Sequence, residues 1–359
     1  MDKIFCFLFL VFISVVFATE MDWYADSIEI TTEEQLREFA NQVSNGNTFE
    51  GKIIALINNI DIKGGEWRRI IGSVSKPFKG TFDGKGNVIS GVNINNSHDC
   101  LGLFAHLDNG TIKNLGVQVD INGRGIIGGL VGINNGTIEN SYVIGSVKGE
   151  RGDIGGLVGF NTRTGVIKNS YSKAIVEGFN SVGGLTGSNL GGTITNSYAM
   201  GNVRATVFGN RDVHVFNGGW VGGLAGYNNG TITDCYATGN VEGISHAGGL
   251  VGFTERRSII INCYAIGNVR TTGRDGLDMA TVGELIGRSK GIVTDCYAIG
   301  KGNRMFGVNI NRRTSPTSKL KTREEMKQQE TFVNWDFDNI WGIGPAINGG
   351  FPHLRVFQQ

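Results

Sequence analysis

The chain has 359 residues, of which 57 are glycine and only 4 are proline, and this excludes both collagen and a proline-rich disordered segment. With 40% hydrophobic and 18% charged residues, the chain has the material for a large core. The formal net charge of +1 provides no overall field that would attract nucleic acid or an acidic membrane.

The first 18 residues have the pattern of a secretory signal peptide. Lys3 supplies a positive charge, an apolar run extends from Ile4 to Phe17, and Ala18 is a small residue before the expected cleavage point. The apolar run is short for a bilayer, which a helix crosses with about 20 residues. We therefore expect residues 1–18 to be removed and the mature chain to be secreted without membrane insertion.

Residues 19–90 are expected to form an N-terminal capping segment. Thr32 followed by Gln35 is a capping-box pattern, so we expect a short helix from this point to about Ser44. Strands around residues 53–62 then lead into the repeats. Such a cap is expected because an open terminal coil would pair with other chains.

A repeated phrase dominates residues 91–303, and a second phrase with Asn or Asp, then Ser or Cys, then Tyr follows each copy. The steps between successive copies of the first phrase are 27, 28, 39, 26 and 35 residues, so one unit has about 27 residues and two units carry insertions. The first phrase, Gly-Gly-Leu-x-Gly, starts at Gly128, Gly155, Gly183, Gly222 and Gly248, and in altered form at Gly283.

Short β-branched runs between glycine and Asn-Gly turns indicate that each unit is one coil of strands. A single coil cannot bury its apolar face, whereas stacked coils build a continuous core. We therefore predict an all-β parallel β-helix (β-solenoid) of about seven coils with short α-helical elements in the N- and C-terminal caps. A propeller is the alternative fold, but its blades repeat at about 40 residues or more.

Equivalent residues of successive units should then stack in columns. We expect an Asn/Asp column at a turn, a tyrosine column with a structural rather than a sugar-binding role, and a column of buried free thiols. These columns comprise Asn140, Asn169, Asn196, Asp234, Asn262 and Asp295; Tyr142, Tyr171, Tyr198, Tyr236, Tyr264 and Tyr297; and Cys235, Cys263 and Cys296.

Residues 304–359 are expected to form a C-terminal capping segment. Thr322 and Glu325 have the spacing that opens a helix, and the bulky residues from Phe332 to Trp341 are expected to plug the last coil.

The repeated phrases resemble the GLUG motif. The sequence Thr81-Phe82-Asp83-Gly84 before the repeats and Asn334-Trp335-Asp336-Phe337 after them add to the resemblance. It implies a β-helix-like repeat region in a secreted or surface protein, as in adhesin-like chains and beside the protease part of immunoglobulin A-specific metallopeptidases. It carries no catalytic residue to this chain, and no histidine here begins a His-Glu-x-x-His zinc pattern.

The two insertions, at residues 203–218 and 269–281, are the best candidates for a functional site. Both leave after the same Gly-Asn-Val strand, so they should project from one edge of the solenoid and border a common groove. The candidate binding residues are Arg204, Arg211, His214, Trp220, Arg270 and Arg274; if the protein is an enzyme, the candidate catalytic residues are Asp212, Glu242, His246 and Asp275.

Three functions fit this groove. The favoured one is a binding or adhesion module for extracellular carbohydrate or a surface protein. The alternative is a polysaccharide-active enzyme, a lyase or hydrolase, in which carboxylates or a histidine act as acid and base. The second alternative is a structural spacer. We expect no cofactor, no metal and no nucleic-acid partner, and leave the oligomeric state open.

Four asparagines match the N-glycosylation pattern and would become modified only in a eukaryotic host. Asn-Gly turn chemistry explains three of them without a glycan. The four are Asn95, Asn109, Asn135 and Asn229.

Overall fold

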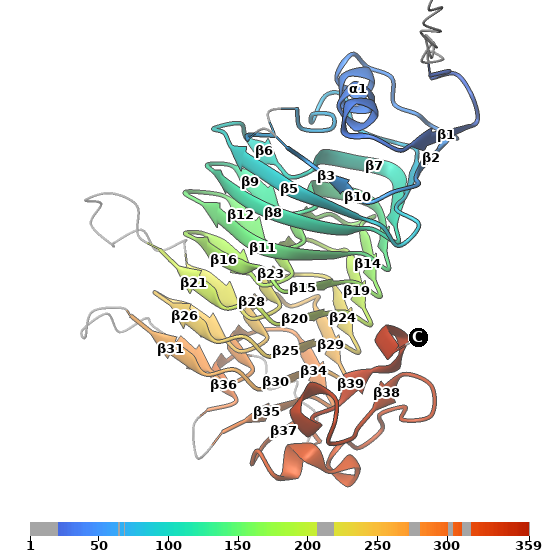
Figure 1. The fold of residues 1–359 in the computed structure, drawn as a ribbon. Helices are drawn as coiled ribbons and strands as arrows, with labels where there is room; N and C mark the ends of the chain where they lie inside the picture. The colour runs from blue at the N-terminus through green and yellow to red at the C-terminus, as the bar shows by residue number, and fades with distance from the viewer. Residues whose placement is uncertain are drawn as a thin grey trace, which may run out of the picture.

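The chain winds into a parallel β-solenoid of about eight turns, one more than the seven expected (Figure 1). The computed structural model describes residues 21–63, 65–67, 69–206, 219–272, 281–300, 304–310 and 317–358. The expected signal peptide and most of both insertions lie outside the described residues. The predicted all-β parallel β-helix is confirmed. Among the described residues, no helix is both long enough and apolar enough to cross a membrane.

Three parallel sheets run along the solenoid, and each coil contributes strands to all three over most of its length. Within the described residues, sheet A has 16 strands: β1 Ser27–Ile30, β2 Ile53–Leu56, β4 Thr81–Asp83, β7 Phe104–Lys113, β10 Val131–Glu139, β13 Val158–Asn161, β14 Val166–Lys168, β18 Thr186–Asn189, β19 Thr193–Thr195, β23 Ala225–Asn228, β24 Thr231–Thr233, β28 Val251–Thr254, β29 Ile259–Ile261, β33 Ile286–Ser289, β34 Ile292–Thr294 and β36 Phe306–Asn309.

Sheet B has 14 strands in the same part of the chain: β3 Ile60–Asp61, β5 Val88–Asn95, β8 Gly116–Gly123, β11 Tyr142–Gly149, β15 Tyr171–Ser172, β16 Ile175–Gly178, β20 Tyr198–Ala199, β21 Val203–Ala205, β25 Tyr236–Ala237, β26 Val241–Gly243, β30 Tyr264–Ala265, β31 Val269–Thr271, β35 Tyr297–Ile299 and β37 Lys319–Lys321. Sheet C, over the described residues, has seven: β6 Cys100–Leu101, β9 Ile126–Gly128, β12 Asp153–Gly155, β17 Ser181–Gly183, β22 Trp220–Gly222, β27 His246–Gly248 and β32 Thr281–Gly283.

The glycines of the repeated phrase lie where sheets C and A meet at a tight corner. A Cβ on Gly183 would lie 2.0 Å from the carbonyl oxygen of Thr186 and 2.8 Å from the Cα of Ala225 in the next coil. A Cβ on Gly187 would lie 2.4 Å from the backbone nitrogen of Ile154. The leucine between them, Leu185, is fully buried in the core. The phrase therefore encodes a close backbone approach that only glycine permits.

The asparagine column forms a turn, as expected, and a second asparagine column lies inside the solenoid. Asn140, Asn169 and Asn196 have φ of +48°, +49° and +47°, the left-handed conformation that asparagine tolerates. The second column is fully buried and its amides bond from coil to coil at 2.7, 2.9 and 2.8 Å. Its members are Asn134, Asn161, Asn189 and Asn228.

The N-terminal end is closed by the helix α1, Glu33–Ser44, which begins with the expected capping box between Thr32 and Gln35. Its apolar face is buried, and the ring of Phe39 packs against Phe49 and Phe78 at centroid distances of 5.1 and 5.6 Å. Strands β1 to β4 continue sheets A and B into this segment, so the cap and the repeats share one core.

The C-terminal segment differs from the expectation in two ways. Thr322 does accept a hydrogen bond from the Glu325 backbone at 3.1 Å, but the expected α-helix is wrong. Extended backbone at Gln328 (φ −115°, ψ 127°) ends the first turn, so only short 3-10 helices form. These are η1 Glu325–Lys327, η2 Gln329–Thr331, η3 Asn348–Gly350 and η4 Arg355–Gln358, together with the antiparallel pair β38 Trp341–Gly342 and β39 His353–Leu354.

The second difference is position: this segment packs along the tyrosine column instead of plugging the last coil. The Trp341 ring lies 6.1 Å from Tyr236 and 6.0 Å from Tyr264. The Tyr264 hydroxyl donates to the carbonyl of Pro352 at 2.6 Å. Figure 1 shows the red C-terminal segment beside the lower coils. The tyrosine column is therefore an internal seam, which confirms its structural role.

The four cysteines in the described part of the chain are free and buried, and this agrees with the expected thiol column. The Cys263 thiol donates to the carbonyl of Ile261 at 3.1 Å, and burial raises the pKa of Cys263 and Cys296 well above the ordinary value.

Candidate functional site

Both insertions leave and rejoin the solenoid at one flank. Strands β21 and β31, which precede the insertions, pair with opposite sides of β26. Strands β22 and β32, which follow them, likewise flank β27. The expected common edge is confirmed for these described ends. Five candidate residues lie in the insertions, outside the described residues: Arg211, Asp212, His214, Arg274 and Asp275.

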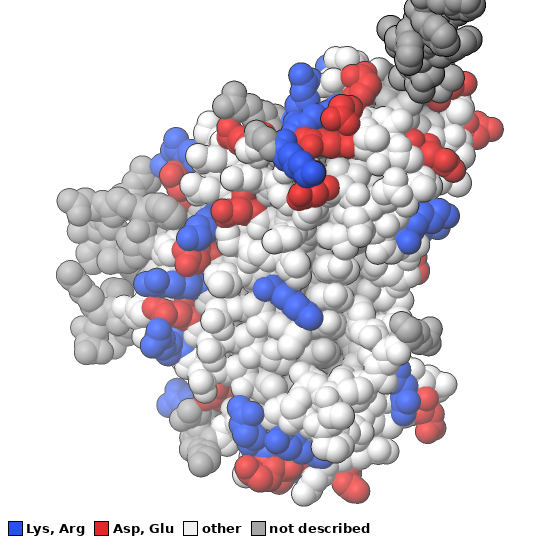
Figure 2. Space-filling view, viewed as in Figure 1, with Lys and Arg blue, Asp and Glu red and all other residues white. Residues whose placement is uncertain are grey.

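A ladder of alternating charge crosses sheet B at this flank. Lys148, Glu177, Arg204, Glu242 and Arg270 occupy equivalent positions of five successive strands. Ion pairs join Lys148 to Glu177 at 3.6 Å and Arg204 to Glu242 at 3.6 Å, and Arg270 to Glu242 at 2.6 Å. Figure 2 shows positive and negative side chains alternating down the flank beside the grey segments.

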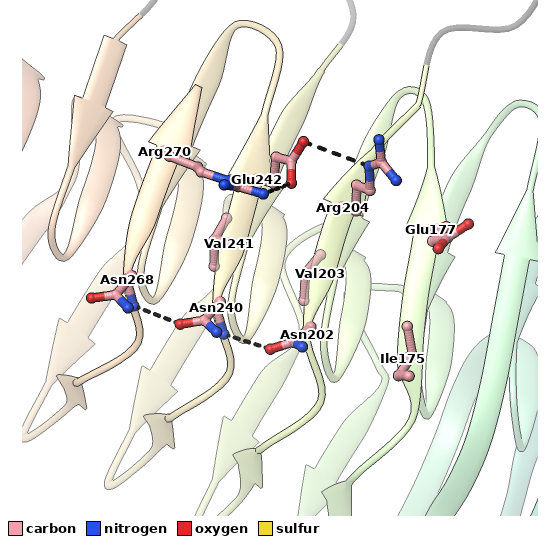
Figure 3. A pocket seen from close by; sticks show the side chains of 10 residues that line it. All are labelled: Ile175, Glu177, Asn202, Val203, Arg204, Asn240, Val241, Glu242, Asn268 and Arg270. Atoms are coloured by element: carbon pink, nitrogen blue, oxygen red, sulfur yellow. Dashed lines mark hydrogen bonds and ion pairs between the residues drawn. The ribbon is translucent and has the colours of Figure 1, made fainter. Parts of the chain in front are cut away.

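The lower part of this ladder borders a shallow depression of about 400 Å³ (Figure 3). A row of exposed asparagines forms its opposite side. The backbone N–H of Asn240 donates to the side-chain oxygen of Asn202 at 3.0 Å, and Asn268 donates to Asn240 in the same way at 3.0 Å. The side-chain oxygens of Asn202 and Asn240 are thus used inside the protein, while their amide nitrogens remain as donors.

Glu242 is held between two arginines. Its Oε1 is 3.6 Å from the Nε of Arg204, and its Oε2 is 2.6 Å from an Nη of Arg270. The Glu242 side chain is 18% exposed, against 58% for Arg204 and 73% for Arg270. The group that this site presents to a ligand is therefore guanidinium rather than carboxylate.

His246 and Trp220 lie at the corner between sheets C and A, outside the lining of the depression. The Nδ1 of His246 is 2.7 Å from the hydroxyl of Thr281. Burial, aided by the nearby charge of Arg288, lowers the pKa of His246 from 6.5 to about 4. The structure therefore brings Arg204, Glu242 and Arg270 together and separates Trp220 and His246 from them.

Trp220 belongs to an aromatic group that we call the corner cluster: Trp220, Tyr227, His246, Phe253 and Arg288. The Trp220 ring stacks on Tyr227 and on Phe253, each at 5.1 Å. The Arg288 guanidinium lies 5.9 Å from the centre of the Phe253 ring.

Sequence reasoning missed the asparagine row, although the signal was present. Asn202, Asn240 and Asn268 each stand one residue before the valine of the Gly-Asn-Val strand. Tyr227, Phe253 and Arg288 occupy one position of the strand that follows the glycine phrase, but their residue types differ, so no column was visible.

The glycosylation candidates fall into two groups. Asn95 and Asn109 are exposed, whereas Asn135 and Asn229 are partly buried and the Asn135 side-chain oxygen is enclosed. Across the described parts of the chain, no three His, Cys, Asp or Glu side chains gather closely enough to hold a metal ion.

Comparison with known proteins identifies the repeat. The family model of the GLUG motif matches residues 151–177 and 217–242, two units of the described solenoid. This chain therefore contains GLUG repeats. Both matches cover the glycine corner together with the sheet B strands β16 and β26, so the GLUG motif corresponds to one coil of this fold.

Two relatives extend the comparison. Halomucin of Haloquadratum walsbyi (strain DSM 16790 / HBSQ001) is 37% identical over 119 residues, which cover 30% of this GLUG-repeat chain and 1% of halomucin. A Bacteroides ovatus crystal structure, provisionally designated an immunoglobulin A1 protease, matches with a TM-score of 0.61 and 25% identity over 92% of both chains. The fold of most of this chain is thus shared with a solved structure.

Proposed function

We propose that this GLUG-repeat protein is a secreted or cell-surface binding and adhesion module whose ligand is an extracellular carbohydrate. The observation that carries the proposal is the depression on sheet B, where Arg204, Arg270 and the three asparagines present hydrogen-bond donors in register. Successive strands are about 4.8 Å apart, so the donors repeat at a spacing comparable to the length of one sugar unit in an extended polysaccharide.

The balanced charges of the depression favour an uncharged, hydroxyl-rich ligand over a strongly charged one. Glu177 and Glu242 balance Arg204 and Arg270, and the ladder ion pairs hold the long side chains in place. A shallow polar surface with ordered donors suits a hydroxyl-rich chain, which gains hydrogen bonds from each rung. An open depression also accommodates a polymer that continues past the site.

Extracellular placement is part of the proposal. The N-terminal sequence has the signal-peptide pattern, and the likeness to halomucin supports the same setting.

The name of the Bacteroides ovatus neighbour raises peptidase activity as a second candidate function. In the proposed role the depression binds its ligand without converting it. Both oxygens of Glu242 are engaged by arginines, and Glu177 pairs with Lys148 at 3.6 Å.

Retention on immobilised polysaccharides tests the proposal. The protein is passed over xylan, dextran, polygalacturonate and chondroitin sulfate, and is compared with the double variant Arg204→Gln/Arg270→Gln. Loss of two donors should weaken retention on the polysaccharides without acid groups at least about ten-fold. Lys168→Gln, which removes an ion-paired lysine of sheet A at 38% exposure, is the matched control and should be retained like the wild type.

Retention of the wild type by none of the four polysaccharides would contradict a carbohydrate ligand. Equal retention of the double variant on the polysaccharides without acid groups would place that binding elsewhere on the molecule. Incubation with immunoglobulin A under the same conditions should leave the immunoglobulin intact; cleavage would favour the second candidate function.

A further inference from the structure

The corner cluster combines a stacked aromatic surface with a cation that has no acidic partner in the described part of the chain. Trp220 and Tyr227 are partly exposed, and their rings stack at 5.1 Å with 30° between the planes. Phe253 continues the surface towards Arg288, its partner on the neighbouring strand β33. Planar apolar surface of this kind packs against the C–H face of a sugar ring.

Arg288 differs in its surroundings from Arg204 and Arg270 of the depression. Arg204 and Arg270 share Glu242, whereas the ion pairs among the described residues do not include Arg288. Its Nε is buried without a hydrogen-bond partner. A guanidinium in this position is suited to a planar anion, which it holds with two parallel hydrogen bonds.

Among the described residues, no ion pair compensates this positive charge. On the adjoining strand ends, Lys290 and Glu255 pair with each other at 3.0 Å, so their charges cancel. His246 contacts the Thr281 hydroxyl at 2.7 Å and stacks near Phe253 at 6.3 Å. Because its pKa is lowered to about 4, His246 is neutral at neutral pH and adds no charge to the cluster.

We propose that the corner cluster is a second binding site, separate from the depression on sheet B, for an acidic sugar unit. The sugar ring packs on Trp220 and Tyr227, and its carboxylate or sulfate pairs with Arg288. The hydroxyl of Thr281, next to His246, lies on the strand across the corner and is available to the same unit.

The test compares a short oligogalacturonate with its methyl ester, which keeps the rings and removes the charges. The wild type should bind the acid at least about ten-fold more tightly than the ester, since a charge-assisted pair adds that much. Arg288→Gln should abolish the difference, and Trp220→Ala should weaken binding of both forms. Arg257→Gln, an exposed arginine of the neighbouring turn, is the control and should keep the difference. A sulfated oligosaccharide in a further titration distinguishes sulfate from carboxylate.

Equal affinity of the wild type for acid and ester, or an unchanged difference in folded Arg288→Gln, would overturn the proposal. If Arg288→Gln does not fold, the wild type is titrated instead and followed by the nuclear magnetic resonance signal of the Trp220 indole N–H. This signal is assigned by its loss in Trp220→Phe. The acid should shift that signal at concentrations at which the ester does not. A signal that neither ligand shifts would overturn the proposal. In Arg204→Gln/Arg270→Gln the shift should persist, which separates this site from the depression.

Discussion

The rings of Tyr171 and Tyr198, from successive coils, stack with centroids 4.7 Å apart and planes 4° from parallel. The same relation continues from Tyr198 to Tyr236 at 4.7 Å. Phe357, almost at the C-terminus, packs edge-on against both Tyr171 and Tyr198 at 5.3 and 4.9 Å. Chain segments far apart in sequence thus lock the stack of coils from outside, which gives the tyrosine column a structural function.

Removal of the central ring of this seam should destabilise the protein. Trp341 is fully buried, and its Nε1 donates to Asp234 at 3.2 Å. Trp341→Ala should lower the free energy of unfolding by about 3–5 kcal/mol, as for other buried aromatic residues. Chemical denaturation followed by circular dichroism measures this change. Val333→Ala, at a 47% exposed position of the same segment, should change it little; equal losses in the two variants would argue against the seam.

A methyl group at the glycine corner should also be destabilising. In Gly183→Ala the new Cβ would meet the Thr186 carbonyl oxygen at 2.0 Å, and backbone cannot move aside as a side chain can. Overpacking of this kind costs about 1–3 kcal/mol or more. The melting temperature should therefore fall in Gly183→Ala and stay unchanged in Gly344→Ala, where nothing lies within 4 Å. A normal melting temperature for Gly183→Ala would mean that sheets C and A do not meet so closely.

Removal of any one side chain of the buried asparagine column should destabilise the protein. Asn161 accepts from the amide of Asn134 at 2.7 Å and donates to Asn189 at 2.9 Å. Asn161→Ala leaves two buried polar groups without a partner, each of which costs about 1–3 kcal/mol. Urea denaturation should show this loss, with Asn268→Ala as the exposed control. Matching denaturation midpoints for the two variants would refute a stabilising column.

His246 should give the protein an acid-sensitive stability. Its pKa is about 4 when folded against 6.5 as the ordinary value, so between these values the unfolded chain binds a proton that the folded chain does not. Stability should therefore fall as the pH is lowered from about 6.5 to 4, and His246→Gln should make this fall less steep. Melting temperatures across this range measure the slope. His98→Gln, at an exposed position, is the control, and parallel slopes for wild type and His246→Gln would contradict the prediction.

The repeat made most of the fold predictable. Because Gly128, Gly155 and Gly183 recur with the same neighbours, each residue of a unit could be assigned its partner in the next, and the strand pairing agrees. The same reasoning located the exits of both insertions and brought Arg204, Glu242 and Arg270 together.

Contacts that depend on how one sheet is placed against another could not be predicted in this way. The periodicity gives the order of strands within a coil, but not the angle at which sheet C meets sheet A. His246 and Glu242, four residues apart, were consequently predicted to line one groove. A turn between β26 and β27 instead places them in different sheets. The C-terminal segment has no repeat at all, so its contact with the tyrosine seam followed from no pattern in the sequence.

Measurement of glycan chain length after prolonged incubation with the protein distinguishes most directly between binding of the glycan and its enzymatic cleavage. The protein is held with the polysaccharides that retain it, and reducing ends and unsaturated products are measured over time. Because Glu242 is engaged by two arginines and His246 lies at a different corner, we expect the glycans to remain bound and of unchanged length. New chain ends that disappear in Glu242→Gln or His246→Gln would contradict a binding module and identify an enzyme.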